Sequence, residues 1–266
     1  MFMKFTVQDL KHKKENGKKI TMLTASDFPM ALLIDKAGID AVLVGDSLGM
    51  TTLGYEATTM VSMDEMIHHA KAVRRGVERA LLVGDMPYLS FQTSDIDAVS
   101  NAKRFVDEAG CDAVKLEGGE DMSARVKAIV SSGIPVIGHV GLTPQTADKL
   151  GGYKVQGKDD ASASKVAADA AAVSAAGACA VVLECVPREL ARRITGELPV
   201  PTIGIGAGPH CDGQVLVTHD IIGYFDRFKP RFVKQYADIG KEISQAVEAY
   251  RTEVEEGIFP DAKHSF

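Results

Sequence analysis

The stretch "AVLVGDSLGM" (Ala41–Met50) is an apolar run that ends in an aspartate, a serine and a glycine turn. A carboxylate at the end of a buried strand is costly to desolvate unless it is paired, bound to a metal or facing water. The same pattern returns at "ALLVGDMP" (Ala80–Pro87). The repetition favours a fold in which the ends of separate strands meet.

Short apolar runs alternate with longer helical patterns along the whole chain. Near-continuous apolar strands separated by helices indicate a parallel sheet that is covered on both faces. Eight such units in 266 residues fit a (β/α)8 barrel better than an open sheet, and we predict one domain over residues 1–266. The strand candidates begin at Lys19, Asp40, Ala80, Asp112, Ile134, Ala180, Val200 and Gly213.

Local signals support the predicted helices. Ser62 and Glu65 have the spacing of a capping box at the start of one helix, and Gly110 is placed to end the next. The seventh unit is the exception, because only "PHCD" separates "GIGAG" (Gly204–Gly208) from the last strand candidate. We therefore expect the seventh crossover to lack a full helix.

Composition excludes several classes of protein. Hydrophobic residues make up 45% and the net charge is -6, so a broad basic surface for nucleic acid is not expected. No run of about 18 apolar residues could span a membrane, and the polar N-terminal stretch does not resemble a secretory signal. The cysteines show neither zinc-finger nor disulfide spacing, which favours small buried thiols in the cytoplasm. They are Cys111, Cys179, Cys185 and Cys211.

Ionisable residues recur where the predicted strands end, which is where barrels carry their catalytic groups. Side chains alternate along a strand, so Asp46 should share a face with Val42 and Val44. By the same rule Asp85 should share a face with Leu81 and Val83. If these faces point into the barrel mouth, one pocket receives several carboxylates, a lysine and an imidazole. The four carboxylates are Asp46, Asp85, Glu117 and Glu184, with Lys115 and His139, and Asp27 lies just after the first strand.

Several carboxylates in one pocket repel each other unless a cation compensates them. Oxygen ligands without cysteine favour Mg²⁺, which can chelate a 2-oxo acid and stabilise its enolate. A further carboxylate clear of the metal could act as general base, and Lys115 would pair with the anionic substrate or the developing oxyanion.

Structural interpretations compete with each of these roles. Asp46 could cap the turn that follows it, although its recurrence with Asp85 favours the metal. Lys115 and Glu117 could form a structural ion pair. His139 could be a core histidine. Glu184 lies between apolar residues, so a raised pKa and a base role are plausible, but a buried ion pair would give the same pattern.

The segment "GLTPQTADKLGGYKVQGK" (Gly141–Lys158) is long, polar and rich in glycine. It could be a mobile lid over the barrel mouth or an ordinary surface loop.

The motifs "VGDSLGM", "VKLEGG", "GHVGLTPQ", "GGYKVQG", "VLECVP", "IGIGAG" and "GIFPDAKHSF" resemble those of the ketopantoate hydroxymethyltransferase family. The resemblance runs from about Thr6 to Phe266 and is specific. It implies a cytoplasmic (β/α)8 TIM barrel of the phosphoenolpyruvate mutase-like arrangement with an N-terminal helix. Such enzymes transfer a one-carbon unit from 5,10-methylenetetrahydrofolate to 3-methyl-2-oxobutanoate, giving 2-dehydropantoate for pantothenate and coenzyme A synthesis.

The resemblance also implies roles for individual residues. It places Mg²⁺, one per subunit, on Asp46, Asp85 and Glu117, with Glu117 acting directly or through water. Substrate contacts are implied for Asp46, Ser47, Asp85 and Lys115. Glu184 corresponds to the proton acceptor, and Lys115 and His139 line the same catalytic pocket. The family assembles as a homodecamer, a pentamer of dimers.

Two other functions fit parts of this pattern. An enzyme of the phosphoenolpyruvate mutase and isocitrate lyase type shares the metal-enolate chemistry, but the sequence has no "KKCGH"-like loop. A catalytically silent barrel that serves as a scaffold would have no need of the full set of acidic and basic residues.

Overall fold

The computed structural model describes residues 3–225, 227 and 230–266. By its internal contacts the chain divides into two compact units, Met1–Val217 and Thr218–Phe266. The first unit contains all the strands described below. A single domain over residues 1–266 stays a prediction.

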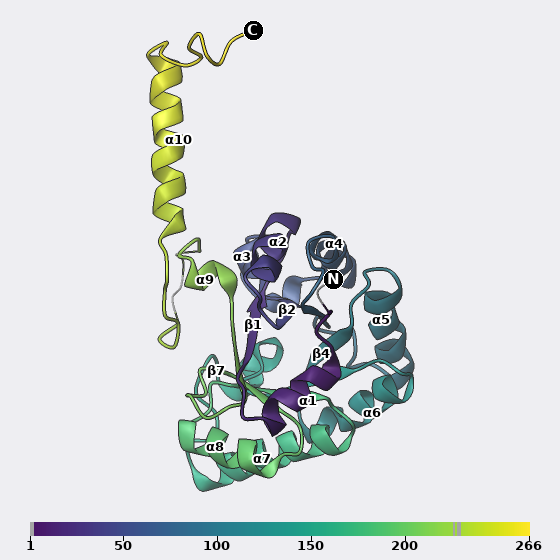
Figure 1. Cartoon of the computed structure of the whole chain (residues 1–266). Helices are drawn as coiled ribbons and strands as arrows, with labels where there is room; N and C mark the ends of the chain where they lie inside the picture. Colours follow the sequence, from purple (N-terminus) through teal and green to yellow (C-terminus); the bar gives the residue numbers. More distant parts are fainter. Residues whose placement is uncertain (1–2, 226, 228–229) are drawn as a thin grey trace. The chain divides into compact units, whose positions relative to one another are not determined.

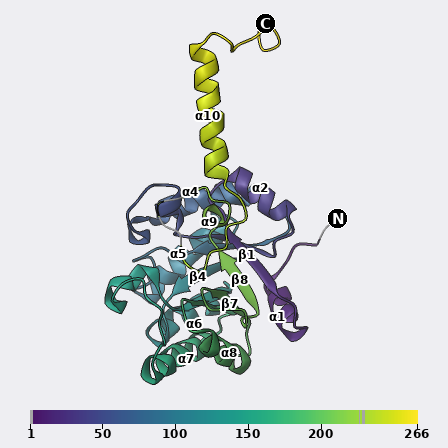
Figure 2. The same ribbon diagram turned by 90° about the vertical axis from the view of Figure 1, so that its left-hand side faces the viewer.

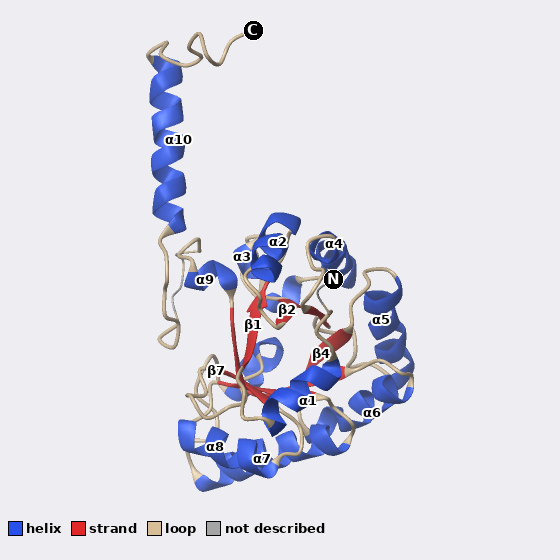
Figure 3. Ribbon diagram, in the orientation of Figure 1, coloured by secondary structure: helices blue, strands red, loops and turns tan. Residues whose placement is uncertain are grey.

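Eight parallel strands of the first unit close into a barrel in the order β1 to β8, with β8 paired to β1. In Figure 3 these strands form the inner part of the unit and its helices lie outside them. All eight strand predictions are confirmed. The strands are β1 (Ile20–Thr24), β2 (Ala41–Val44), β3 (Leu81–Asp85), β4 (Ala113–Glu117), β5 (Val136–Gly141), β6 (Ala180–Glu184), β7 (Thr202–Ile205) and β8 (Gly213–Leu216).

Helices follow most of the strands in sequence and cover the outside of the barrel. The N-terminal helix precedes the first strand, and its Leu10 packs in the same apolar cluster as the barrel interior. Helices α7 and α8 lie side by side in both Figure 1 and Figure 2. The helices of the first unit are α1 (Val7–Glu15), α2 (Phe28–Lys36), α3 (Leu48–Thr51), α4 (Met63–Arg74), α5 (Asp95–Asp107), α6 (Ser123–Ser131), α7 (Asp160–Ala175) and α8 (Arg188–Glu197). Short 3₁₀ segments are η1 (Thr58–Met60), η2 (Glu120–Met122) and η3 (Pro144–Leu150).

The described part of the second unit contains two helices, α9 (Thr218–Ile221) and α10 (Ile239–Glu255). None of the residues of α10 is buried. Within the described residues no helix is both long and apolar enough to cross a membrane.

The local signals in the sequence are confirmed. The Ser62 side chain accepts a hydrogen bond from the Glu65 N–H at 3.3 Å, and the Glu65 carboxylate accepts one from the Ser62 N–H at 2.8 Å. Gly110 follows α5 with a left-handed φ of 67°. No helix separates β7 from β8, so the seventh crossover is as short as "PHCD" predicts.

The buried apolar side chains form two clusters, one inside the barrel and one between the strands and the surrounding helices. Leu81 and Val83 belong to the inner cluster, so Asp85 on the same strand face points into the barrel as predicted. The prediction for Asp46 is wrong in its reasoning, because Val42 and Val44 pack in the outer cluster with the helices. Strand β2 ends at Val44, and the turn that follows breaks the alternation before Asp46.

Candidate active site

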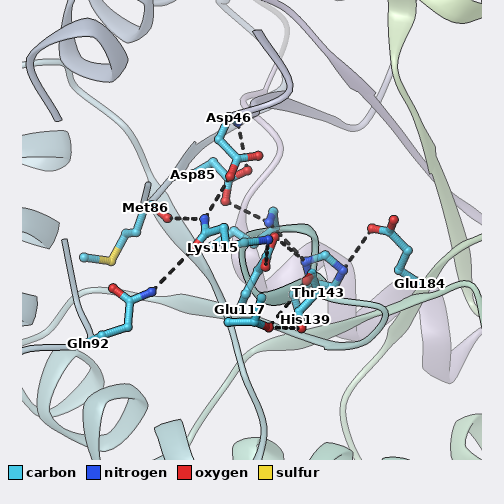
Figure 4. A network of polar contacts seen from close by, with 11 residues as sticks. Asp46, Asp85, Met86, Gln92, Lys115, Glu117, His139, Thr143 and Glu184 are labelled. Atoms are coloured by element: carbon cyan, nitrogen blue, oxygen red, sulfur yellow. Dashed lines mark hydrogen bonds and ion pairs between the residues drawn. The ribbon is translucent and has the colours of Figure 1, made fainter. Parts of the chain in front are cut away.

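All the predicted ionisable residues except Asp27 converge on one rim of the barrel. They come from the ends of neighbouring strands β2 to β6, and Figure 4 shows them as one network of polar contacts. In the strand register Asp85 lies opposite Lys115, and Glu117 lies opposite His139. These four side chains are buried, so their charges and hydrogen bonds must be satisfied by one another or by a ligand.

Asp46 and Asp85 lie next to each other at the ends of β2 and β3. The Asp46 N–H donates to Asp85 Oδ2 at 3.1 Å, and Lys115 Nζ lies 2.8 Å from Asp85 Oδ1. The Asp46 carboxylate in turn accepts a hydrogen bond from Gln145 Nε2 at 2.8 Å. Its partner therefore belongs to another loop, which argues against the interpretation of Asp46 as a cap of its own turn.

His139 lies between Lys115 and Glu184 (Figure 4). Its Nδ1 is 3.3 Å from Lys115 Nζ and its Nε2 is 3.1 Å from Glu184 Oε2. An ammonium has only donors, so Nδ1 must be the acceptor and a neutral ring then carries its proton on Nε2. That proton faces Glu184, although the contact is close without being aligned as a hydrogen bond.

Burial controls the protonation of this group. Burial lowers the pKa of the His139 ring well below its ordinary value, and the neighbouring Lys115 charge lowers it further, so the ring is neutral. Burial also lowers the pKa of Lys115, but the negative charges of Asp85, Glu117 and Asp46 outweigh it and the net pKa is raised. Lys115 is therefore cationic.

Burial raises the pKa of a carboxyl group, whereas it lowers the pKa of a histidine or a lysine. Burial raises the pKa of Asp85 to about 7, against the opposing charge of Lys115. Burial likewise raises the pKa of Glu184 to about 7 and that of Glu117 well above its ordinary value. Such shifted groups are typical of catalytic sites, and Glu184 near neutrality is suited to accept a proton.

Gln145, in η3, is a site residue that the sequence reasoning did not single out. Its backbone N–H donates to Glu117 Oε2 at 2.9 Å, while its side chain holds Asp46. The residue lies inside the quoted motif "GHVGLTPQ", but an uncharged amide in a loop has no periodicity that would mark it.

Two residues named from the sequence lie apart from this network. Asp27 caps α2, because its carboxylate accepts a hydrogen bond from the Met30 N–H at 2.8 Å. Its place at a strand end is thus structural. Ser47 follows Asp46 at the start of α3 and is partly exposed.

The loop Gly141–Lys158 lies close to the acidic residues. Burial raises the pKa of the Tyr153 phenol, and the charges of Asp46, Glu117 and Glu184 raise it further. Tyr153 is nevertheless 61% exposed, so it lies at the outer edge of the site. Whether the loop moves as a lid stays a prediction.

The donor set fits a divalent cation that is held by few protein ligands. No group of three or more His, Cys, Asp or Glu residues is arranged as a metal cage within the described part of the chain. Asp46 and Asp85 nonetheless offer adjacent carboxylates, and Asp85 Oδ1 is buried without an aligned hydrogen-bond donor. Mg²⁺ commonly binds one or two carboxylates and completes its shell with water and substrate oxygens.

Comparison with known proteins identifies the family. Residues 4–262 match the sequence model of the family described as "Ketopantoate hydroxymethyltransferase". The chain belongs to the ketopantoate hydroxymethyltransferase family. A relative from Moorella thermoacetica, named 3-methyl-2-oxobutanoate hydroxymethyltransferase, is 61% identical over 98% of this chain and 97% of its own length. A relative of the same name from Acetivibrio thermocellus is 57% identical over 99% of this chain and 93% of its own length.

Solved structures place the fold of this ketopantoate hydroxymethyltransferase family member among similar barrels. Phosphonopyruvate hydrolase in complex with oxalate and Mg²⁺ matches with a TM-score of 0.65 and 14% identity, over 97% of this chain and 92% of that protein. A 2,3-dimethylmalate lyase, a member of the phosphoenolpyruvate mutase/isocitrate lyase superfamily, gives 0.62 and 16%, over 99% and 93%. The predicted phosphoenolpyruvate mutase-like barrel is confirmed.

Proposed function

We propose that this chain transfers a hydroxymethyl group from 5,10-methylenetetrahydrofolate to 3-methyl-2-oxobutanoate, giving 2-dehydropantoate and tetrahydrofolate. The name shared by the full-length relatives supports the reaction. The observation that carries the mechanism is the placement of His139 between a cationic Lys115 and a Glu184 whose pKa is near 7. The phosphoenolpyruvate mutase and isocitrate lyase alternative is supported only at the level of the fold.

Asp46 and Asp85 are the residues we expect to hold Mg²⁺. The phosphonopyruvate hydrolase crystal structure contains Mg²⁺ with oxalate, a planar dianion that resembles the enolate of a 2-oxo acid. When bound, the metal would withdraw electrons from the keto group and stabilise that enolate. Glu117 is better placed to act through water, because one of its oxygens is already bonded to the Gln145 N–H.

The protein's own side chains divide the remaining work. Lys115 would bind the anionic end of the oxo acid and its developing enolate oxygen. Glu184 would remove the proton from C3, and the neutral His139 ring would present its Nε2–H to the Glu184 carboxylate and orient it. The new bond joins C3 to the methylene carbon of the folate, and both bonds from that carbon to the folate nitrogens break. Water supplies the hydroxyl oxygen, and tetrahydrofolate leaves with one proton that came from C3 and one from the water. Ser47 is a proposed substrate contact.

Association into a homodecamer, arranged as a pentamer of dimers, is also proposed. Self-association of some kind is supported by an apolar stripe on α10 formed by Ile243, Val247, Tyr250 and Val254, which are 42%, 60%, 59% and 45% exposed. Residues at this spacing lie on one helix face, and such faces are normally buried. We expect action in the cytoplasm, in keeping with four unpaired cysteines.

Exchange of the C3 proton tests the mechanism without the folate. Wild-type protein with Mg²⁺ should exchange the C3 proton of 3-methyl-2-oxobutanoate with deuterium from heavy water, as followed by NMR. Glu184→Gln should lose at least about 100-fold in exchange rate, because the general base is gone, while it retains binding of the oxo acid. Equal exchange by both proteins would exclude Glu184 as the base.

Asp85→Asn provides the second arm of the test. Calorimetry should show weaker binding of Mg²⁺ and of the oxo acid together, since one residue serves both. Unchanged affinity for Mg²⁺ would return Asp85 to a structural role.

A further inference from the structure

Gln145 makes an unusual number of contacts with the candidate metal-binding residues. Its side chain is buried although it comes from a polar, glycine-rich loop. Its Nε2 donates to Asp46 Oδ2 at 2.8 Å and to the Met86 carbonyl oxygen at 3.0 Å, and its backbone N–H donates to Glu117 Oε2 at 2.9 Å. A single loop residue thus bonds carboxylates that follow β2 and end β4.

The orientation of the amide is fixed by its surroundings. Asp46 and the Met86 carbonyl can only accept hydrogen bonds, so the NH₂ end of the Gln145 amide must face them. Its Oε1 faces the other way and accepts a hydrogen bond from Gln92 Nε2 at 3.4 Å. In Figure 4 Asp46 lies at the top of the network, Met86 at its left and Gln92 below Met86. If the Gln145 amide were flipped, its Oε1 would face both the Asp46 carboxylate and the Met86 carbonyl oxygen, and both contacts would be repulsive.

These hydrogen bonds fix the orientation of the two carboxylates and leave one oxygen of each without a bond to Gln145. Each carboxylate has two oxygens, and Gln145 engages one oxygen of Asp46 and one of Glu117. Outer residues that orient ligating carboxylates in this way contribute strongly to metal affinity, since they fix the ligands before the ion arrives. Simple anchoring of the loop would require only the bond to the Met86 carbonyl.

We propose that Gln145 is a positioning residue that holds Asp46 and Glu117 in the orientation needed to bind the divalent cation, and so couples the loop Gly141–Lys158 to cation binding. This inference rests on the proposed function, because it presumes that these carboxylates serve a cation. It assigns Gln145 no contact with the reacting atoms.

Binding of Mn²⁺, measured by electron paramagnetic resonance, tests the inference without reference to turnover. Gln145→Met keeps the side-chain volume and the backbone N–H but removes the amide, and should weaken Mn²⁺ binding by about 10-fold or more. In the wild type, the electron paramagnetic resonance signal of bound Mn²⁺ should also change when 3-methyl-2-oxobutanoate is added. Gln156→Met is the matched control, because Gln156 lies in the same loop and, among the described residues, its side chain bonds only to the Lys154 carbonyl, at 3.0 Å.

A second variant guards against a folding defect at the buried position. Gln92→Met removes the hydrogen bond from Gln92 Nε2 to Gln145 Oε1 without changing Gln145 itself. It should weaken Mn²⁺ binding by a smaller factor than Gln145→Met does. Circular dichroism and thermal unfolding establish that each variant is folded.

The outcomes separate this inference from the proposed function. If the wild type binds Mn²⁺ and exchanges the C3 proton while folded Gln145→Met binds Mn²⁺ within twofold of the wild type, the positioning role is wrong and the proposed function stands. A loss of turnover by Gln145→Met with unchanged Mn²⁺ affinity also overturns it. If the wild type itself binds no Mn²⁺ and exchanges no proton, both proposals fail.

Discussion

At the scale of single residues, Glu184 shows how position creates reactivity. It ends β6, and its side chain is only 14% exposed. An ordinary glutamate would be ionised at neutral pH but would be a weak base. Burial raises the pKa of Glu184 to about 7, which makes its carboxylate a stronger base near neutrality.

The rate of C3 proton exchange should therefore depend on pH through Glu184. Only the deprotonated form can accept a proton, so at saturating Mg²⁺, which would keep Asp85 deprotonated, kcat/KM for exchange should rise about tenfold per pH unit below about 7 and level off above it. Exchange rates measured by NMR from pH 5 to pH 9 would show this limb. A midpoint near the ordinary glutamate pKa would mean that Glu184 is not the titrating base.

The sequence alone identified most of the ionisable site residues because strand ends in a parallel barrel have a fixed functional side. It could not order them in space. The pairing of Lys115 with Asp85 and His139 depends on the register of β3, β4 and β5, which no local pattern encodes. Gln145 was missed because it is uncharged, and Asp27 was included although it caps a helix.

At the scale of elements, the end of β5 is held very close to the end of β6. Gly141 has a φ of 93°, and a Cβ added there would lie 2.4 Å from the Glu184 carbonyl oxygen. That oxygen accepts a hydrogen bond from the Leu142 N–H at 2.9 Å. The absence of a side chain at Gly141 thus permits the contact that fixes the backbone of the proposed base.

Gly141→Ala should lower both stability and proton exchange. The left-handed backbone costs an alanine about 1–2 kcal/mol, and the clash with the Glu184 carbonyl should displace the base and slow exchange by at least about 10-fold. Gly133→Ala is the control, because Gly133 has a similar φ of 90° but open space around it. Denaturant unfolding should show a loss for both variants, whereas slowed exchange should be confined to Gly141→Ala; a similar exchange rate in both would contradict the argument.

Element boundaries were predictable where the chemistry is local. Ser62 and Glu65 form the expected capping box at α4, and the missing seventh helix followed from the length of "PHCD". The face of Asp46 was not predictable by alternation, because β2 ends two residues earlier and the turn reorients the chain.

At the scale of the whole molecule, the count of alternating strands and helices was enough to predict the closed barrel. The described chain leaves α10 without any buried residue, even though its apolar side chains repeat along one face. Sequence periodicity indicates such a face but gives no information about what covers it.

Replacing Val247 by Asp on that face should weaken self-association, because a charge cannot be buried in an apolar contact without cost. Light scattering coupled to size-exclusion chromatography should show a homodecamer for the wild type and smaller species for Val247→Asp. Glu248→Gln, a change at the neighbouring position of α10, should leave the mass unchanged. A wild-type protein that elutes as a monomer would refute the proposed assembly.

The buried carboxyl group of Glu184, at the end of β6, also affects the free energy of unfolding of the barrel. A carboxyl whose pKa is raised in the folded state retains its proton there more firmly than in the unfolded chain, so this group contributes its full stabilising effect below about pH 4.5 and loses it as the pH rises through about 7. The loss amounts to at most about 3 kcal/mol. The pH range in which Glu184 stabilises the folded chain therefore lies below the range in which it can accept a proton, so raising the pH through about 7 favours proton transfer and removes this one contribution to stability.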